Sequence, residues 1–355
     1  MASNPGSEQH GGINPAELKQ FGITPADLID FSVNSNPFGP SPGVLTAVRA
    51  VDFSTYPDPF CSALRESLAQ VNQVTPGHIL PGNGTAELIW LIAQSLLTPG
   101  DKVLIVGPTF GEYQRAAVQW GAKIEEIRAL PPHFHPPVDQ VLTSIRQSKP
   151  RLVFLCNPNN PTGAYLEPPI LKQVIDACGS ETLLVLDEAY QAFVQGTLFA
   201  GLPAENCLVL RSMTKEFALA GLRLGYVMGK PEIITRMRQF QPSWSVNSFA
   251  QAAGLAGIAD AGYYHQTLAE LKKLSQPFFN SIQAAGYAVV PSDVHFGIFA
   301  AGCPARDLRQ RLMAFRCQVR DCTSFGLPTH IRVSTRTSVD NQKLLEAMQA
   351  VRAAF

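Results

Sequence analysis

The sequence predicts an α/β protein that has a large domain with a mostly parallel central sheet flanked by helices, and a smaller α+β domain at the C-terminal end. From about residue 80 to residue 229, short apolar runs alternate with polar, Gly/Pro-rich turns and helical stretches. Strands that are apolar throughout are typical of a sheet covered by helices on both faces. After about residue 250 the pattern changes to one long helical stretch followed by short strands and helices. That change predicts the second domain.

The expected strands of the large sheet are the five apolar runs 102–106, 151–156, 182–187, 207–212 and 222–229. We expect a helix over 87–97, directly after a glycine-rich turn. The predicted boundaries are an N-terminal arm over 1–40, a large domain over 41–250 and a small domain over 251–355. The arm is rich in turn-forming residues and lacks periodicity, so we expect it to cover a cleft.

In the small domain the pattern indicates a long helix over 251–284 and a closing helix from Val339. Between them we expect short alternating elements: strands within 286–292 and 295–302, a helix over 305–315, and strands within 317–322 and 330–336.

The composition excludes several function classes. The 355 residues include 28 basic and 28 acidic side chains, for a formal net charge of zero, so neither a nucleic acid nor a membrane surface is an expected partner. No apolar stretch has the length of a membrane-spanning helix, and residues 1–12 lack the pattern of a secretion signal. The seven cysteines form no C-x-x-C pair, which favours reduced thiols in a cytoplasmic protein without a metal site.

Four polar motifs are expected at the edge where sheets of this kind bind ligands; one directly precedes the expected helix over 87–97, and the other three follow expected strands. They are 82–86 (GNGTA), 157–163 (NPNNPTG), 187–190 (DEAY), and the pair formed by 212–215 (SMTK) and 220–223 (AGLR). Each alone has an ordinary structural explanation: a tight turn, a rigid loop, a carboxylate paired with an arginine, a surface lysine. Together they supply a helix start for a phosphate, an acid for a ring nitrogen, an amide and a phenol for a ring oxygen, and a lysine for an imine. These are the contacts that pyridoxal 5′-phosphate requires.

Over nearly its whole length the chain resembles the fold type I pyridoxal-phosphate enzymes of the aspartate aminotransferase superfamily. The motifs GNGTAEL, NPNNPTG, DEAY and S-x-x-K followed by GLRLGY carry this resemblance. It implies that 41–250 is the cofactor-binding domain, that Lys215 binds the cofactor covalently and later moves protons, and that Asp187 pairs with the ring nitrogen. Asn160 and Tyr190 would donate to the ring oxygen, so that Lys215, Asp187 and Tyr190 are the expected catalytic residues.

The resemblance also implies how the rest of the cofactor is held. Phe110 would stack on the ring, and Tyr56 would reach the cofactor phosphate of a neighbouring subunit, which implies a homodimer with shared active sites. The phosphate of the chain's own cofactor would lie against Gly84, Thr85, Ala86, Ser212, Thr214 and Arg223.

Two families within the superfamily compete. The strings NSNPFGPSP, YPDP and TKEFALAGLRLGY resemble histidinol-phosphate aminotransferases, whereas the opening His10-Gly11-Gly12, the string 242–247 (PSWSVN) and Arg336 resemble threonine-phosphate decarboxylases. The second set predicts decarboxylation of L-threonine O-3-phosphate to (R)-1-amino-2-propanol O-2-phosphate in cobalamin biosynthesis. The alternative is transamination of histidinol phosphate with 2-oxoglutarate in histidine biosynthesis, and Tyr190, the usual residue in aminotransferases, favours it.

Both substrates are small amino compounds that carry a phosphate, so extra cations and N–H donors are expected in the site. By the resemblance, Arg332 matches the family's arginine for a substrate carboxylate. The planar guanidinium of an arginine suits bidentate binding of such a group. The full set of expected substrate-binding residues is His10, Gly11, Asn34, Asn160, Arg320, Arg332 and Arg336.

Two other classes fit less well. A non-enzymatic relative of this fold would lack the lysine or the aspartate, and both are present. A dinucleotide-dependent oxidoreductase would need the turn G-x-G-x-x-G, and GNGTAE lacks its third glycine.

Overall fold

The computed structural model describes residues 11–194 and 204–353. No helix in these two segments is both long and apolar enough to cross a membrane. The α-helices are α1 (Pro15–Phe21), α2 (Pro42–Arg49), α3 (Ser62–Val71), α4 (Gly84–Leu96), α5 (Glu112–Gln119), α6 (Val138–Ser148), α7 (Pro168–Cys178), α8 (Pro231–Arg238), α9 (Ser248–Ala259), α10 (Ala261–Ala284), α11 (Ala305–Ala314) and α12 (Ser338–Ala353). The strands are β1 (Ile29–Asp30), β2 (Ile79–Asn83), β3 (Lys102–Gly107), β4 (Lys123–Arg128), β5 (Leu152–Cys156), β6 (Leu183–Asp187), β7 (Cys207–Ser212), β8 (Leu224–Met228), β9 (Ala288–Val289), β10 (Phe296–Ala300), β11 (Cys317–Gln318), β12 (Arg320–Asp321) and β13 (His330–Ser334).

Within the described residues, the larger sheet has seven strands in the order β2-β8-β7-β6-β5-β3-β4. Strand β8 runs antiparallel to both of its neighbours, and the other pairs are parallel. This arrangement confirms the predicted α/β fold with a mostly parallel sheet.

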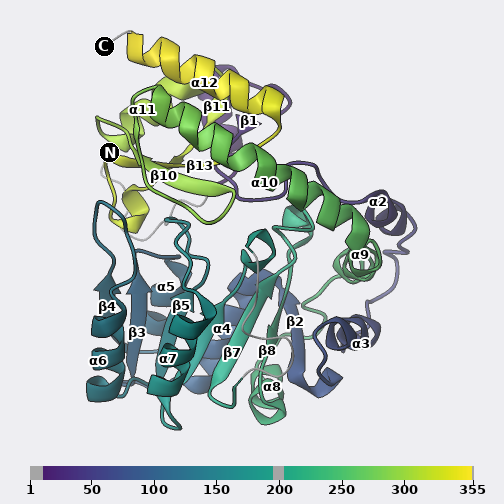
Figure 1. Ribbon diagram of the computed structural model, residues 1–355. Helices are drawn as coiled ribbons and strands as arrows, with labels where there is room; N and C mark the ends of the chain where they lie inside the picture. The colour runs from purple at the N-terminus through teal and green to yellow at the C-terminus, as the bar shows by residue number, and fades with distance from the viewer. Residues whose placement is uncertain (1–10, 195–203, 354–355) are drawn as a thin grey trace.

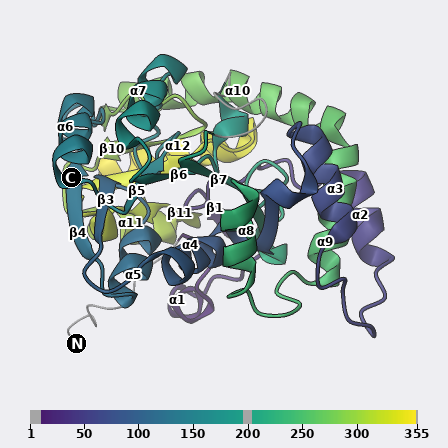
Figure 2. The same ribbon diagram turned by 90° about the horizontal axis from the view of Figure 1, so that it is seen from below.

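Helices cover both faces of this sheet because its strands are apolar on both sides. Alternate residues enter different cores: Val153 of β5 belongs to a core that includes residues of α3, α6, α7 and α9, whereas Phe154 belongs to a core that includes residues of α4, α5 and α8. The two layers are visible from the front in Figure 1 and from below in Figure 2. Asp187 and Ser212 lie in register with the residues that face α4 and α5.

Three details differ from the sequence prediction. Strands β2 and β4 were not expected: β2 includes part of the motif read as a turn, and β4 is a charged, largely exposed edge strand without an apolar run. The stretch 251–284 forms two helices, because α9 ends at Ala259 and α10 begins at Ala261. Between them, the carboxylate of Asp260 accepts hydrogen bonds from Ser41 (2.5 Å) and from the amide of Gly43 (3.1 Å), which ties the break to α2.

The smaller sheet, as far as the structure describes it, has the order β12-β13-β10-β9 and is antiparallel. Helices α10, α11 and α12 cover one face of it, and Figure 1 shows this layer above the large sheet. The chain near the N-terminus joins this layer, because β1 pairs with β11. The amide of Gly12 donates to Oγ of Ser32 (2.9 Å), and Gln318 donates to the carbonyl of Gly12 (2.6 Å).

Candidate active site

A cavity of about 470 Å³ lies between the carboxyl ends of β5, β6 and β7 and the smaller sheet. Fourteen of the expected site residues line it: Gly11, Asn34, Thr85, Ala86, Phe110, Asn160, Asp187, Tyr190, Ser212, Thr214, Lys215, Arg223, Arg320 and Arg332. The sequence motifs are thus brought together from distant parts of the chain at the sheet edge that the fold predicts.

Asp187 is the last residue of β6, and its side chain is buried. Its Oδ2 accepts a hydrogen bond from the phenol of Tyr113 (2.7 Å), and its Oδ1 accepts one from the amide of Ala189 (2.9 Å). Burial raises the pKa of Asp187, while these hydrogen bonds and the nearby charge of Lys215 oppose the rise. A cation placed against this carboxylate would favour its ionised form.

Lys215 lies in the turn that follows β7. Burial lowers the pKa of its amine to about 8, assisted by the positive charges of Arg332 and Arg223 and opposed by Asp187. Its Nζ lies 5.8 Å from the centre of the Tyr190 ring. A lysine in this state has a substantial neutral fraction near pH 8, which a nucleophilic amine needs.

The start of α4 forms an anion cradle. No side chain caps this helix, so the amides of its first turn lack a side-chain acceptor, and Thr85 and Ala86 of that turn line the cavity. The hydroxyls of Ser212 and Thr214 lie 2.7 Å from each other beside them. Arg223 completes the cradle with its backbone in the left-handed region, at φ 60°.

Gly84 permits this arrangement without lining the cavity. Its φ is +76°, and a Cβ at this position would lie 2.7 Å from Nη2 of Arg223. The positive φ favours glycine here, and a side chain would also displace the guanidinium from its present position.

Tyr190 and the side-chain amides of Asn34 and Asn160 also line the cavity. The amide nitrogen of Asn34 donates to the Tyr190 hydroxyl (3.3 Å), and Arg332 donates to Oδ1 of Asn160. Burial raises the pKa of Tyr190 above its ordinary value, so its phenol stays protonated as a donor.

Arg320 and Arg332 are direct cross-strand neighbours, paired between β12 and β13. Arg332 donates to the carbonyl of Ser32 (2.5 Å), and Arg320 donates to Ser324 (2.7 Å). Both are buried, and neither forms an ion pair with a carboxylate of the described residues. Burial lowers the pKa of Arg320 to about 10, and the charge of Arg332 contributes. Two like charges placed directly opposite each other favour a bound anion.

Three of the expected residues do not reach the cavity wall. Tyr56 is 80% exposed in the single chain and stacks on Trp244, with ring centres 4.6 Å apart. Arg336 is directed elsewhere: its Nε binds Asp340 (3.1 Å) and its Nη1 donates to the carbonyl of Asp30 (3.2 Å). Gly84 is the third, for the reason given above. His10 lies outside the described residues.

The cavity also contains residues that sequence reasoning missed. Tyr113 holds Asp187, Ser32 supplies the carbonyl bound by Arg332, and Ser324 binds Arg320. The sequence offers only a weak signal for Tyr113, its place three residues after Phe110, which resembles that of an ordinary core aromatic. Nothing in the sequence marks the two serines.

The residues present fit pyridoxal 5′-phosphate. The cradle around Thr85 suits its phosphate, and the ring of Phe110 lies on the cavity wall where it can face the cofactor ring. The buried carboxylate of Asp187 suits a protonated ring nitrogen, and Lys215 has the amine that could bind the aldehyde carbon.

Comparisons with known proteins agree with this cofactor. Residues 26–351 match the family model "Aminotransferase class I and II". A histidinol-phosphate aminotransferase of Symbiobacterium thermophilum is 34% identical over 341 residues, which cover 95% of this chain and 94% of that protein. A histidinol-phosphate aminotransferase of Shouchella clausii is 33% identical, with 88% and 86% covered. The crystal structure of the Sinorhizobium meliloti histidinol-phosphate aminotransferase with pyridoxal-5′-phosphate has a TM-score of 0.86 at 24% identity, with 97% and 96% covered.

These relatives contradict the predicted threonine-phosphate decarboxylase activity and its place in cobalamin biosynthesis. An L-threonine-O-3-phosphate decarboxylase of Porphyromonas gingivalis matches with a TM-score of 0.82 over 91% of this chain and 99% of that one, but at 23% identity this likeness concerns the fold alone. The prediction depended partly on Arg336, which the structure pairs with Asp340 away from the cavity. The decarboxylase prediction is therefore wrong. The chain is an enzyme that uses pyridoxal phosphate, and it belongs to the aminotransferase class I and II family.

Proposed function

We propose that this protein is an aminotransferase that takes an amino group from histidinol phosphate and transfers it to 2-oxoglutarate. The observation that carries the proposal is the pair Arg320 and Arg332, two buried guanidinium groups in register on neighbouring strands, in one cavity with Lys215 and Asp187. Such a pair suits a doubly charged phosphate monoester. The names of the relatives described above supply the identity of the amino donor.

The same pair suits the second substrate. Histidinol phosphate carries a phosphate and no carboxylate, whereas 2-oxoglutarate carries two carboxylates, so one cavity must bind both kinds of anion in turn. Arg320 and Arg332 present planar donor groups that bind either kind. We assign the phosphate of the donor and the carboxylates of the acceptor to this pair, with Asn34 and Gly11 on the adjoining wall.

We assign the remaining cofactor contacts to residues that line the cavity. We assign the ring nitrogen to Asp187, the ring oxygen to Tyr190 and Asn160, and the ring face to Phe110. The phosphate is assigned to the cradle formed by Thr85, Ala86, Ser212, Thr214 and Arg223.

The chain's own groups then account for the reaction. Pyridoxal phosphate, when bound, supplies a carbonyl that exchanges amino groups and a ring that withdraws electrons. With the cofactor bound, the neutral Nζ of Lys215 would remove the proton from the donor carbon that bears the amino nitrogen and would return a proton to the carbon on the other side of that nitrogen. Asp187 holds the positive charge of the ring nitrogen, and Tyr190 donates to the ring oxygen. Anchoring the remote phosphate at Arg320 fixes the rotation that presents the C–H bond to Lys215.

We further propose that the active protein is a homodimer in which Tyr56 reaches the partner's cofactor phosphate. Tyr56 belongs to a group of exposed aromatic side chains beside α3 and α9: Phe53 is 79% exposed, Phe60 is 55% exposed and Trp244 is 46% exposed. Such a patch is costly to leave in water and favours a covered face. One chain has a mass of 38.5 kDa, and light scattering should give twice that value. An active enzyme that is monomeric would contradict the proposed dimer.

Steady-state assays test the function. We expect glutamate to form from histidinol phosphate and 2-oxoglutarate, and Arg320→Met to raise the KM for both substrates at least about tenfold, because each loses a charged hydrogen bond. The proposal would be contradicted if cofactor-loaded protein formed no glutamate. It would also be contradicted if Arg320→Met had the same KM for histidinol phosphate as wild type.

A further inference from the structure

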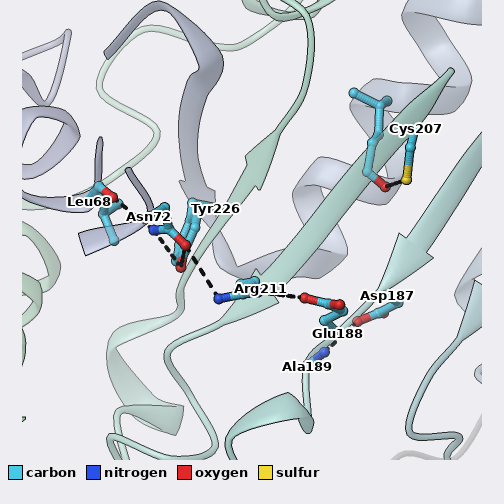
Figure 3. A network of polar contacts seen from close by, with 9 residues as sticks. Leu68, Asn72, Asp187, Glu188, Ala189, Cys207, Arg211 and Tyr226 are labelled. Carbon is cyan, nitrogen blue, oxygen red and sulfur yellow. Dashed lines mark hydrogen bonds and ion pairs between the residues drawn. The ribbon is translucent and has the colours of Figure 1, made fainter. Parts of the chain in front are cut away.

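A largely buried ion pair lies on the face of the large sheet that points away from the cavity. Nη2 and Nε of Arg211 donate to Oε2 of Glu188 at 2.7 and 3.0 Å. The Glu188 side chain is 2% exposed and that of Arg211 is 22% exposed. Figure 3 shows the pair between the ends of its two strands, next to Asp187.

Strand alternation explains this placement. Asp187 and Ser212 share the face of α4 and α5, so Glu188 and Arg211, each one position away, point to the other face. The strands are in register at this level, because Asp187 pairs with Leu210 and the amide of Glu188 donates to the Leu210 carbonyl (2.9 Å). The ion pair therefore joins β6 and β7 where both strands deliver cavity residues.

Hydrogen bonds connect the pair to α3 and to β8. Nη1 of Arg211 donates to Oδ1 of Asn72 (3.3 Å), just beyond α3. The Asn72 amide donates to the carbonyl of Leu68 (2.8 Å) and to the hydroxyl of Tyr226 on β8 (3.2 Å). Figure 3 follows this chain of contacts from α3 to β6. The ion pair between β6 and β7 is thus part of a hydrogen-bonded chain that reaches α3 and β8.

We propose that Arg211 and Glu188 are positioning residues for the reaction: their ion pair sets the spacing between Asp187 and the turn that carries Lys215. The cofactor spans these two residues, since its ring nitrogen and its aldehyde carbon are separated by the rigid ring. A shift between β6 and β7 would therefore misplace one of the two contacts. The inference depends on the cofactor site and is independent of which amino donor the enzyme uses.

The pair does more than hold the sheet together. An apolar pair of similar size could supply equal stability on a buried face. Two N–H groups of Arg211 converge on Oε2 of Glu188 and fix the position of that oxygen in the residue directly after Asp187, which an apolar contact does not. The positive charge of Arg211 also offsets the negative charge of Glu188, which would otherwise repel that of Asp187.

The test compares holoenzyme variants Arg211→Met, Arg211→Lys, Glu188→Gln and the double variant Glu188→Gln/Arg211→Met. The measurements are kcat per cofactor-loaded site, the visible circular dichroism of the bound cofactor per mole bound, and Tm. The control is Glu181→Gln, which removes an exposed ion pair with Lys149 (2.8 Å) near the opposite ends of β5 and β6.

We expect each single variant to lose about 10- to 100-fold in kcat, as misplacement by about an ångström does, with the KM changed less than about threefold. The ellipticity per bound cofactor should fall together with kcat. Arg211→Lys keeps the positive charge without the planar guanidinium, so its kcat and ellipticity should lie between those of wild type and those of Arg211→Met. The double variant should regain Tm relative to the single variants without regaining kcat. The control should match wild type in kcat and ellipticity.

Normal kcat per loaded site and normal ellipticity in Arg211→Met would overturn the proposal, even if Tm falls, because the pair would then serve stability alone. If Arg211→Met does not fold, the same two values in Arg211→Lys decide in the same way. The ellipticity requires no amino donor. A wild-type enzyme inert toward histidinol phosphate would therefore refute the proposed function while the ellipticity still decides the role of Arg211.

Discussion

The phenol of Tyr113 donates to Oδ2 of Asp187 across 2.7 Å, from the first turn of α5 to the end of β6, with both side chains buried. This hydrogen bond favours the ionised carboxylate against the effect of burial, which raises the pKa of Asp187. In Tyr113→Phe we expect that pKa to rise further, the hold on the cofactor ring nitrogen to weaken, and kcat to fall about tenfold or more, as loss of a charged hydrogen bond predicts.

The control for that variant is Tyr287→Phe, since the Tyr287 hydroxyl is also buried but donates only to the carbonyl of Met348 (3.5 Å) in the small domain. Single-turnover rates and the pH titration of the visible cofactor band measure the effect. Equal rates in Tyr113→Phe and Tyr287→Phe would show that Asp187 does not depend on Tyr113.

A methyl group at residue 84 should damage the phosphate cradle. Gly84→Ala places a Cβ at 2.7 Å from Arg223 and puts a side chain at φ +76°, a strain of about 1–2 kcal/mol. We expect the Kd for pyridoxal phosphate to rise about tenfold or more, by fluorescence titration of the cofactor-free protein. Gly262→Ala, in α10 with nothing within 4 Å of its Cβ, should leave the Kd unchanged and add up to about 1 kcal/mol of stability. The same Kd in both variants would show that cofactor binding does not depend on a glycine at position 84.

The amine of Lys215 determines how fast the cofactor-free protein is reloaded. Its pKa is lowered to about 8 from the ordinary 10.5, chiefly by burial, and only the neutral amine attacks an aldehyde. Below pH 8 the rate constant for covalent attachment should rise about tenfold per pH unit and then level off. Stopped-flow absorbance across a pH series measures it. A rate that continues to rise to about pH 10.5 would mean that Lys215 behaves as a solvated lysine.

Arg336 provides a contrast to Arg320 within the same domain. Because its side chain binds Asp340 and the carbonyl of Asp30, Arg336→Ala should leave the KM for histidinol phosphate within about twofold of wild type. It should lower the free energy of unfolding by about 1 kcal/mol, the usual value of a partly buried hydrogen-bonded contact. Denaturant unfolding and steady-state kinetics check both values. A large rise in KM would return Arg336 to the substrate site.

Much of the fold and the cofactor site could be predicted because their signals are local. The runs that became β5, β6 and β7 are apolar throughout, and each ends in a polar motif, so Asn160, Asp187 and Lys215 could be placed at one sheet edge without a structure. Parallel strands bring their carboxyl ends to one edge of the sheet, so the motifs that follow them lie close together although they are distant in sequence.

The remaining features depend on register and packing, which leave no local pattern. That Arg320 lies opposite Arg332 follows from the pairing of β12 with β13, and that Arg336 points away follows from its contacts with Asp30 and Asp340. Strand β4 is a charged edge strand, so its burial signal is weak. Tyr113 becomes a site residue only because α5 packs against the face on which Asp187 lies.

The most direct test of the central claim is a half-reaction: cofactor-loaded enzyme is mixed with histidinol phosphate in the absence of any oxo acid. We predict that the visible band of the lysine-bound cofactor disappears and that about one equivalent of oxo product forms per active site, after which 2-oxoglutarate restores the band and releases glutamate. An unchanged band would contradict the account. So would repeated turnover of an amino-acid phosphate with loss of carbon dioxide and without an oxo acid.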